Sequence, residues 1–415
     1  MRLFKLEIKR ILKTRATLVL LFLALGLSFV MAYLPITFSY NSYTDANGDT
    51  VKLTGLASIA YEKKLQADIA GSVTPQKVRQ AVESYQACLT KYGVENSYDL
   101  PEGVYQSEIF PYAPLLHGIR EAFADRSTGI APSIMEIAPQ EVDRYYEVCR
   151  ERLVSLMQME QEKHPAAQKA AVTMYEKVEK PYLFFPGYST DAMDYQIILA
   201  FLVLLFCAII AAPVFTSDYQ TGADDILRCT KCGKIKFAVT KMISMLFITG
   251  ITFTLCAVIY ITVSNNLWGW ECTKTSIQML YSIVNLPNMN IGQLQCFIAI
   301  FGLVCILSNV SFTLFLSSRF KNLTASLSAA LLFCILPTII YMLLPAEIGS
   351  WIYSILPAGG NGLQTSVLYA AIDFDFWNIG TISIWLPHVM LGAYIIEIPL
   401  FLFLTVYSYV KHEAG

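Results

Sequence analysis

The chain has 415 residues, of which 55% are hydrophobic and 15% are charged. Soluble domains carry about 25% charged residues, so this composition excludes a fully water-soluble protein and indicates an integral membrane protein. The formal net charge of −2 gives no electrostatic case for a nucleic-acid partner.

Six windows of the chain are long and apolar enough to cross a bilayer, which takes about 20 residues for roughly 30 Å of hydrocarbon. We therefore expect an all-α integral membrane protein with six transmembrane helices. The windows span about 16–37, 195–216, 237–263, 293–317, 323–345 and 384–409.

Charge distribution predicts the orientation. The first 15 residues carry six basic side chains, and the connections after the second and fourth windows are also basic. The positive-inside rule therefore places both termini in the cytoplasm (N-in, C-in). All five tryptophans fall in or beside connections that this topology puts outside, as expected for a residue that favours the membrane interface.

Residues 1–15 are expected to form a cytoplasmic amphipathic helix that lies in the interface, with its apolar side in lipid. The alternative is a plain charged stop before the first transmembrane helix, 16–37. The residues that define the two faces are Phe4, Ile8, Ile11 and Leu12 on the apolar side, and Lys5 and Lys9 on the basic side.

Residues 41–193 are expected to form an extracytoplasmic domain, large enough for a core of its own. The segment holds 15 Lys and Arg against 21 Asp and Glu. Its helical periodicity, without the alternation typical of strands, predicts a mostly helical domain, with one helix opened by Thr74-Pro75. Cys88 and Cys149 could form a disulfide if this compartment is oxidising.

The remaining 195–411 is expected to be a five-helix transmembrane region. Two further outer connections, 265–292 and 346–383, join its helices, and the Pro357–Gly360 sequence must break any helix in the second.

Familiar catalytic patterns are missing from the sequence. It contains no G-x-x-x-x-G-K-[ST] phosphate loop, no H-E-x-x-H and no G-x-S-x-G, and its four histidines are too scattered to predict a metal site. Within the last window, His388 and Glu397 are candidates for a transport pathway, because ionisable residues in membranes are functional candidates. Glu397 could equally make a helix–helix hydrogen bond. We expect a protein that is not an enzyme.

The connection between the second and third windows is the most informative stretch. Its sequence from Ser217 is SDYQTGADDILRCTKCGKIKFAVTK, which predicts a short helix between Gly222 and Gly233 with acidic residues in its first turn. The alternative is a solvated loop whose charges only set topology. The candidate partner-binding residues are Asp218, Gly222, Asp224, Asp225, Arg228, Thr230, Lys231, Gly233 and Lys234.

This pattern resembles the permeases of the type 2 ATP-binding-cassette exporter family. The resemblance lies in Asp218, Gly222, Ile226-Leu227, Thr230-Lys231, Gly233-Lys234 and Lys241. It covers roughly 1–37 and 195–411 and leaves 41–193 unidentified. Two positions differ from the family pattern: Asp218 stands where glutamate is frequent, and Lys234 stands where arginine is common.

The resemblance implies that 218–236 is a coupling helix against two copies of a separate ATP-binding subunit. ATP and Mg²⁺ would bind that subunit, and this chain itself would bind no cofactor. It would pair with a second copy or a sister permease in a bacterial cytoplasmic membrane. The expected function is export of an amphipathic substrate, such as an antimicrobial peptide, a hydrophobic drug or a lipid-linked molecule.

Two other classes remain open. One is a membrane receptor or scaffold whose outer domain senses a ligand and signals through another chain. The other is an intramembrane enzyme, which needs paired catalytic groups. Its only candidates, His388 and Glu397, lie about 14 Å apart along a helix.

Overall fold

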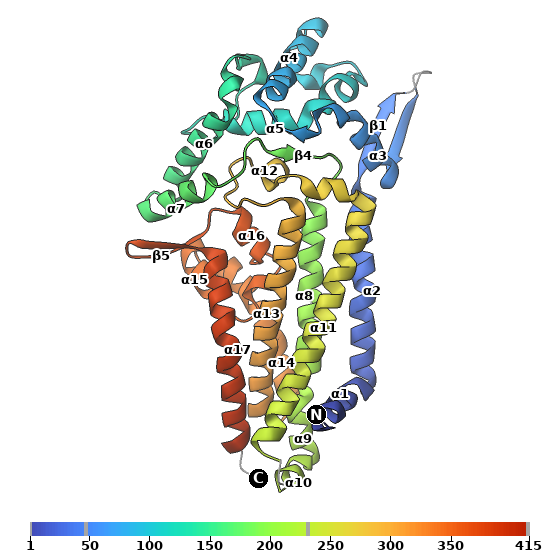
Figure 1. Ribbon diagram of the computed structural model, residues 1–415, viewed down its shortest axis with the longest axis vertical. Helices are drawn as coiled ribbons and strands as arrows, with labels where there is room; N and C mark the ends of the chain where they lie inside the picture. The colour runs from blue at the N-terminus through green and yellow to red at the C-terminus, as the bar shows by residue number, and fades with distance from the viewer. Residues whose placement is uncertain (1, 45–48, 230–232, 412–415) are drawn as a thin grey trace.

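The computed structural model describes residues 2–44, 49–229 and 233–411. It contains six helices long and apolar enough to span a membrane, which confirms the predicted number and marks a multi-pass membrane protein. These helices run side by side as a bundle (Figure 1). Most of residues 39–190, called the head here, lies at one end, and both ends of the chain lie at the other (Figure 1).

The six membrane-spanning segments match the apolar windows to within a few residues. One of them consists of two helices, because Pro213 begins α9 directly after α8 ends. The helices are α2 (Arg15–Phe38), α8 (Asp191–Ala211) with α9 (Pro213–Thr221), α11 (Ile235–Trp268), α13 (Ile291–Arg319), α14 (Leu323–Leu343) and α17 (Leu386–Lys411).

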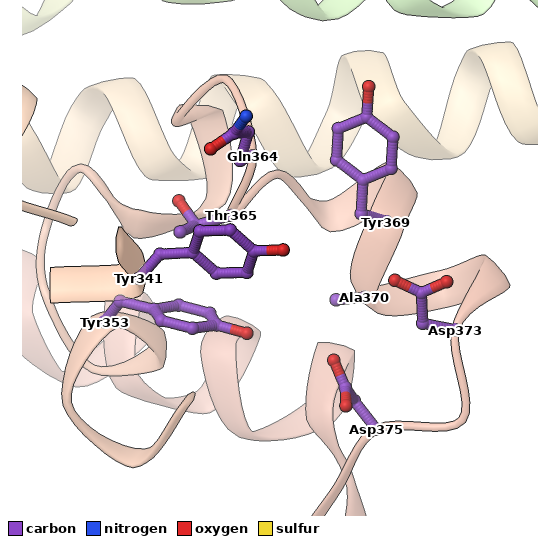
Figure 2. A pocket seen from close by; sticks show the side chains of 8 residues that line it. All are labelled: Tyr341, Tyr353, Gln364, Thr365, Tyr369, Ala370, Asp373 and Asp375. Carbon is purple, nitrogen blue, oxygen red and sulfur yellow. The ribbon is translucent and has the colours of Figure 1, made fainter. Parts of the chain in front are cut away.

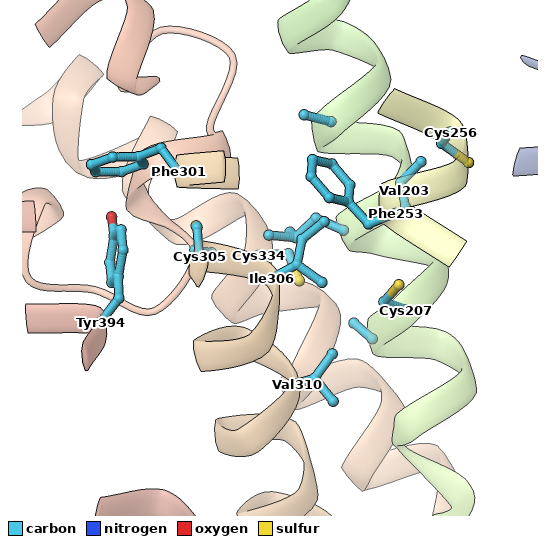
Figure 3. Packing of buried hydrophobic residues seen from close by; sticks show 14 of the residues in the cluster. Val203, Cys207, Phe253, Cys256, Phe301, Cys305, Ile306, Val310, Cys334 and Tyr394 are labelled. Atoms are coloured by element: carbon cyan, nitrogen blue, oxygen red, sulfur yellow. The ribbon is translucent and has the colours of Figure 1, made fainter. Parts of the chain in front are cut away.

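The core of the bundle lies around α8 and α13, whose apolar stretches are the most buried. Figure 3 shows buried side chains of several helices meeting there. The Phe301 and Tyr394 rings pack edge to face with centroids 5.7 Å apart, which joins α13 to α17. Close packing of this kind holds apolar helices together in a membrane, where no water drives them into contact.

The segment after α14 folds back into the bundle. It contains α15 (Ala346–Ser354), the 3₁₀ turn η8 (Gly359–Asn361) and α16 (Val367–Ile372). The Asn361 amide donates to the Gly302 carbonyl of α13 (3.1 Å), and the Cys305 thiol donates to the Pro357 carbonyl (3.3 Å). Residues 357–362 are buried, so only part of the expected outer connection 346–383 is a surface loop. Glycines allow this approach because they bring no side chain.

The head is mostly helical but contains short strands, so the expectation of a segment without strands is wrong. Both strand pairs were missed because their strands are only two to five residues long, too short for a clear alternation signal. The helices are α3 (Leu56–Leu65), α4 (Pro75–Tyr92), α5 (Ala113–Ala122), α6 (Tyr145–Glu160) and α7 (Pro165–Tyr175). The antiparallel pairs are β1 (Tyr40–Thr44) with β2 (Thr50–Thr54), and β3 (Gly71–Ser72) with β4 (Leu183–Phe184).

Helix α4 follows the predicted start. Pro75 is its first residue, and the Thr74 hydroxyl accepts from the Lys77 N–H. Its end is set by Gly93, whose φ of +67° gives a left-handed cap.

The apolar core of the head is formed mostly by its own residues but is not closed by them alone. Residues from two connections of the bundle complete it: Ile283, Val284 and Leu286 after α12 (Ile277–Leu280), and Phe376 and Trp385 of the β5 (Phe376–Ile379) and β6 (Ile382–Trp385) hairpin. The buried hydroxyls of Tyr175 and Tyr182 both donate to the Ile283 carbonyl, at 3.2 and 2.9 Å. The head and the bundle are therefore one folded unit.

The predicted disulfide between Cys88 and Cys149 is not formed. Both are buried free thiols. Cys88 lies against Glu108, and Cys149 lies beside Tyr145. Burial raises the pKa of both thiols, which keeps them protonated and unreactive.

Candidate functional site

The site lies at the end of the bundle opposite the head, where α1 (Arg2–Lys13), α9, α10 (Ala223–Arg228) and the start of α11 meet (Figure 1). Gly222 separates α9 from α10 and has a φ of +68°, a conformation that favours glycine. It breaks the continuation of the second span, as the sequence predicts.

Helix α1 has the predicted two faces. Lys5 and Lys9 are exposed, whereas Ile11 is buried. Phe4, Ile8 and Leu12 are half-buried. The apolar face does not point into lipid alone, because part of it packs on the protein: the rings of Phe4 and Phe247 lie 5.7 Å apart, and Ile11 belongs to the bundle core. Helix α1 is thus attached to α11.

A network of four charged groups joins three of these segments. Oδ1 of Asp218, in α9, accepts from Arg10 Nη1 of α1 at 2.9 Å. Oδ2 of Asp218 accepts from Lys241 Nζ of α11. Arg10 also pairs with Glu7, with Nη2 and Oε1 2.5 Å apart. Glu7, Asp218 and Lys241 are buried.

The lysine is the most enclosed member of the network. Lys241 has no exposed surface, and its ammonium also donates to the Val214 carbonyl (2.6 Å). The Phe215 and Phe237 rings each lie 4.9 Å from it, within cation–π distance. Lys241 therefore does not extend to the bundle surface, although lysines near the start or end of a membrane span commonly do. Asp218 holds it inside.

The electrostatics of the network are balanced, with two carboxylates against two cations. A buried ion pair is costly to desolvate and is tolerated when its remaining polar atoms are hydrogen-bonded. Here Asp218 uses both oxygens, one for each cation. The network consequently fixes the relative positions of α1, α9 and α11.

Further hydrogen bonds connect α9 to the rest of the bundle. The Ser317 hydroxyl of α13 donates to the Ala212 carbonyl (2.7 Å) and accepts from the Phe215 N–H (3.0 Å). The Tyr219 hydroxyl donates to the Ser318 carbonyl at 3.3 Å. Displacement of α9 would therefore act on α13 as well as on α1 and α11.

Helix α10 is shorter than the sequence predicts. It ends at Arg228, one turn before the expected end near Gly233. Asp224 and Asp225 lie in its first turn as predicted, the former buried and the latter exposed. Its most exposed apolar side chain is Ile226, at 74%. Ile226 follows the exposed Asp225, so this side of α10 presents both an acidic and an apolar side chain.

The other predicted residues of this connection are only partly described. Thr230 and Lys231 lie outside the described residues. Gly233 is buried, and its carbonyl accepts from the Tyr409 hydroxyl (3.2 Å), which links the connection to α17. Lys234 is exposed and precedes α11.

The structure does not bring His388 and Glu397 together. Glu397 Oε2 accepts from the Ser308 hydroxyl of α13 (2.6 Å), the helix–helix hydrogen bond that the sequence left open. His388 is exposed and packs on the Trp385 ring with centroids 5.1 Å apart. His388 and Glu397 therefore contact different residues and do not form a catalytic pair.

Sequence reasoning missed Glu7 and Arg10 as members of the site. One signal could have found them, and a second could have found the pairing of Lys241 with Asp218. Glu7 and Arg10 stand three residues apart, so they share one helix face. Lys241 stands within an apolar window and needs an acidic partner, which Asp218 at the end of the preceding window can supply.

The site holds no metal cluster in the described residues, since no three His, Cys, Asp or Glu side chains gather there or elsewhere in that part of the chain. No protein-family model matches this chain, and no curated protein matches it.

Proposed function

We propose that this chain is the membrane-spanning permease subunit of an ATP-driven exporter of the type 2 ATP-binding-cassette family. In this proposal both termini and α10 face the cytoplasm of a bacterium, and the head lies outside. Two copies of a separate subunit bind ATP and Mg²⁺, and the permease pairs with itself or with a sister permease. The substrate is amphipathic.

The network of Glu7, Arg10, Asp218 and Lys241 is the observation that carries this proposal. An ATP-driven transporter must convert motion of an external subunit into motion of membrane helices. Helix α10 exposes Ile226 and directly follows α9, and α9 is joined through Asp218 to α1 and α11. These segments have the connections for such a transfer.

The mechanism that follows is a rigid-body rearrangement. Closure of the ATP-binding subunits would push on α10 and α1 together, and α9, α11 and α13 would move with them. The substrate must bind the two resulting states with different affinity, since otherwise ATP energy would not be coupled to transport.

The first test is purification of the tagged full-length chain from its native host in mild detergent, with its partners identified by mass spectrometry. We expect a stoichiometric ATP-binding subunit. Ile226→Glu should remove it, because a carboxylate would then enter an apolar contact. Ile130→Glu, at a comparably exposed position (70%) in the head, should retain it.

Two results would contradict the proposal. One is the absence of an ATP-binding subunit from the unmodified chain in several detergents. The other is equal loss with both variants. Recovery of a signalling protein in its place would favour the receptor or scaffold function.

A further inference from the structure

Two adjoining cavities lie where the head meets the bundle, at the end opposite the charged network. The larger has a volume of about 810 Å³ and the smaller about 260 Å³, and both are lined by Tyr341, Tyr353, Asp373 and Asp375. Sites for small organic molecules span about 300–1,000 Å³. The larger cavity therefore has room for an organic molecule and far exceeds the volume of one metal ion.

The walls come from several parts of the chain. The head contributes Glu160 and His164 near the end of α6, and the segment after α14 contributes Glu347 of α15. Figure 2 shows Tyr341 and Tyr353 side by side, with their hydroxyl groups pointing toward the side where Asp373 and Asp375 lie. The cavity thus has an aromatic side and an acidic side.

The negative charge of the cavity is not balanced by the protein. Four carboxylates line the larger cavity, and no lysine or arginine lines either one in the part of the chain that the structure describes. Within residues 2–44, 49–229 and 233–411, neither Asp373 nor Asp375 makes a salt bridge or a side-chain hydrogen bond. Among the described residues that line the two cavities, the one side chain that can become a cation is His164, whose Nε2 lies 3.9 Å from Glu347 Oε1.

The wall near the aspartates is held in place. The Gln161 amide donates to the Phe374 carbonyl (3.2 Å), between the two aspartates in sequence, and the Asn378 amide donates to Gln161 Oε1 (3.2 Å). The head therefore positions the segment between α16 and β5, which carries the carboxylates. A site fixed before its ligand arrives loses less entropy on binding.

The arrangement selects one chemical class of ligand. A metal ion needs several converging ligands, and no three of these acidic or imidazole groups converge in the described residues. Tyrosine faces attract organic cations through their ring quadrupole, and unpaired carboxylates attract the same charge. An anion would be repelled, and a neutral apolar molecule would cover the half-buried Asp375 carboxylate without giving it a partner.

We propose that this cavity binds an amphipathic organic cation, with its charge held by Asp373 and Asp375 and its apolar part against Tyr341 and Tyr353. The binding site is independent of the proposed coupling to an ATP-binding subunit. It is measured on the purified chain alone, so its failure and the failure of the transport proposal are distinguishable.

The main test uses two probes of nearly the same shape and opposite charge, tetraphenylphosphonium and tetraphenylborate. Equilibrium dialysis with the purified full-length chain in dodecyl maltoside should show saturable binding of the phosphonium above the detergent blank. Asp373→Asn with Asp375→Asn should weaken that binding at least tenfold. The matched control, Asp68→Asn with Asp99→Asn, removes two exposed acidic groups of the head and should leave it unchanged.

A second pair of variants tests the aromatic side. Tyr341 is 49% exposed, so its replacement should not disturb folding. Tyr341→Leu should weaken phosphonium binding several-fold, whereas Tyr341→Phe keeps the ring and should bind like the unmodified chain. Four results overturn the proposal: no saturable phosphonium binding, equal uptake of tetraphenylborate, unchanged affinity in the double asparagine variant, or equal affinity of the two Tyr341 variants.

Binding should also depend on pH. Burial, with Asp373 and Glu160 nearby, raises the pKa of Asp375 to about 6. The Asp375 carboxylate is therefore ionised at pH 7.5 and mostly protonated at pH 5, and phosphonium affinity should fall by about tenfold between them. Glu160, Glu347, His164 and Asp373 face the same cavity, so Asp375→Asn serves as the reference. A pH dependence as steep in that variant as in the unmodified chain would contradict the role of Asp375.

Discussion

Replacing Asp218 by asparagine is expected to lower the free energy of unfolding by about 3–5 kcal/mol, the usual cost of leaving a buried charge without its partner. Lys241 would lose the only carboxylate that it contacts in the described residues, and its remaining neighbours, the Val214 carbonyl and two phenylalanine rings, are neutral. Water does not replace the lost charge, since Lys241 has no exposed surface. The effect should appear as a lower unfolding midpoint in detergent, followed with a thiol-reactive dye. The bundle holds buried cysteines that react only when it opens: Cys207, Cys256, Cys305 and Cys334.

The double variant Asp218→Asn with Lys241→Met shows how much of the lost stability comes from the unpaired charge and how much from changed packing. Methionine fills much of the volume of the lysine stem without a charge, so most of the lost stability should return. Asp225→Asn is the control, because that carboxylate is exposed on α10. The single variant Lys241→Met completes the comparison. If the stability losses of Asp218→Asn and Lys241→Met simply add in the double variant, Asp218 and Lys241 do not interact as the structure describes.

Gly359→Ala is expected to have the second large effect. A Cβ at this position would lie 2.0 Å from the Tyr353 carbonyl oxygen, a backbone atom that cannot rotate away. Overpacking of a core typically costs about 1–3 kcal/mol, and occasionally more. The segment from α15 to α16 should therefore leave its place against α13.

Labelling of Cys305 reports this displacement, because its thiol donates to the Pro357 carbonyl in the same segment. We expect faster labelling of Cys305 in Gly359→Ala than in the unmodified chain. Gly392→Ala is the matched control: a Cβ there meets nothing within 4 Å, and alanine favours the helix. Unchanged labelling in Gly359→Ala would show that the segment is not packed as described.

The sequence predicted best what depends on local pattern. Apolar windows located all six spanning helices, and the faces of α1 and the start of α4 at Thr74-Pro75 followed from spacing and capping alone. Each of these features is set by residues within a few turns of one another, so no tertiary contact is needed to infer it.

Features that depend on contacts between residues far apart in the chain could not be predicted from the sequence. Asp218 pairs with Arg10, 208 positions away, and with Lys241, 23 positions away. The burial of residues 357–362 depends on α13 and α17 leaving space for glycine. The cavity between the head and the bundle combines Glu160 with Asp375. Apart from the need of Lys241 for an acidic partner, no period or motif in the chain encodes these proximities.

The shared core of the head and the bundle has a consequence for the order of folding. About 195 residues separate the end of the head at residue 190 from Trp385, which helps to close the apolar core of the head. Ribosomes add about 5–20 residues per second, so synthesis of that stretch takes about 10–40 s. During this interval the head has been made, but the side chains that complete its interior have not. Its apolar surface must stay protected until the last connection arrives, and a product truncated before residue 385 would keep that surface exposed.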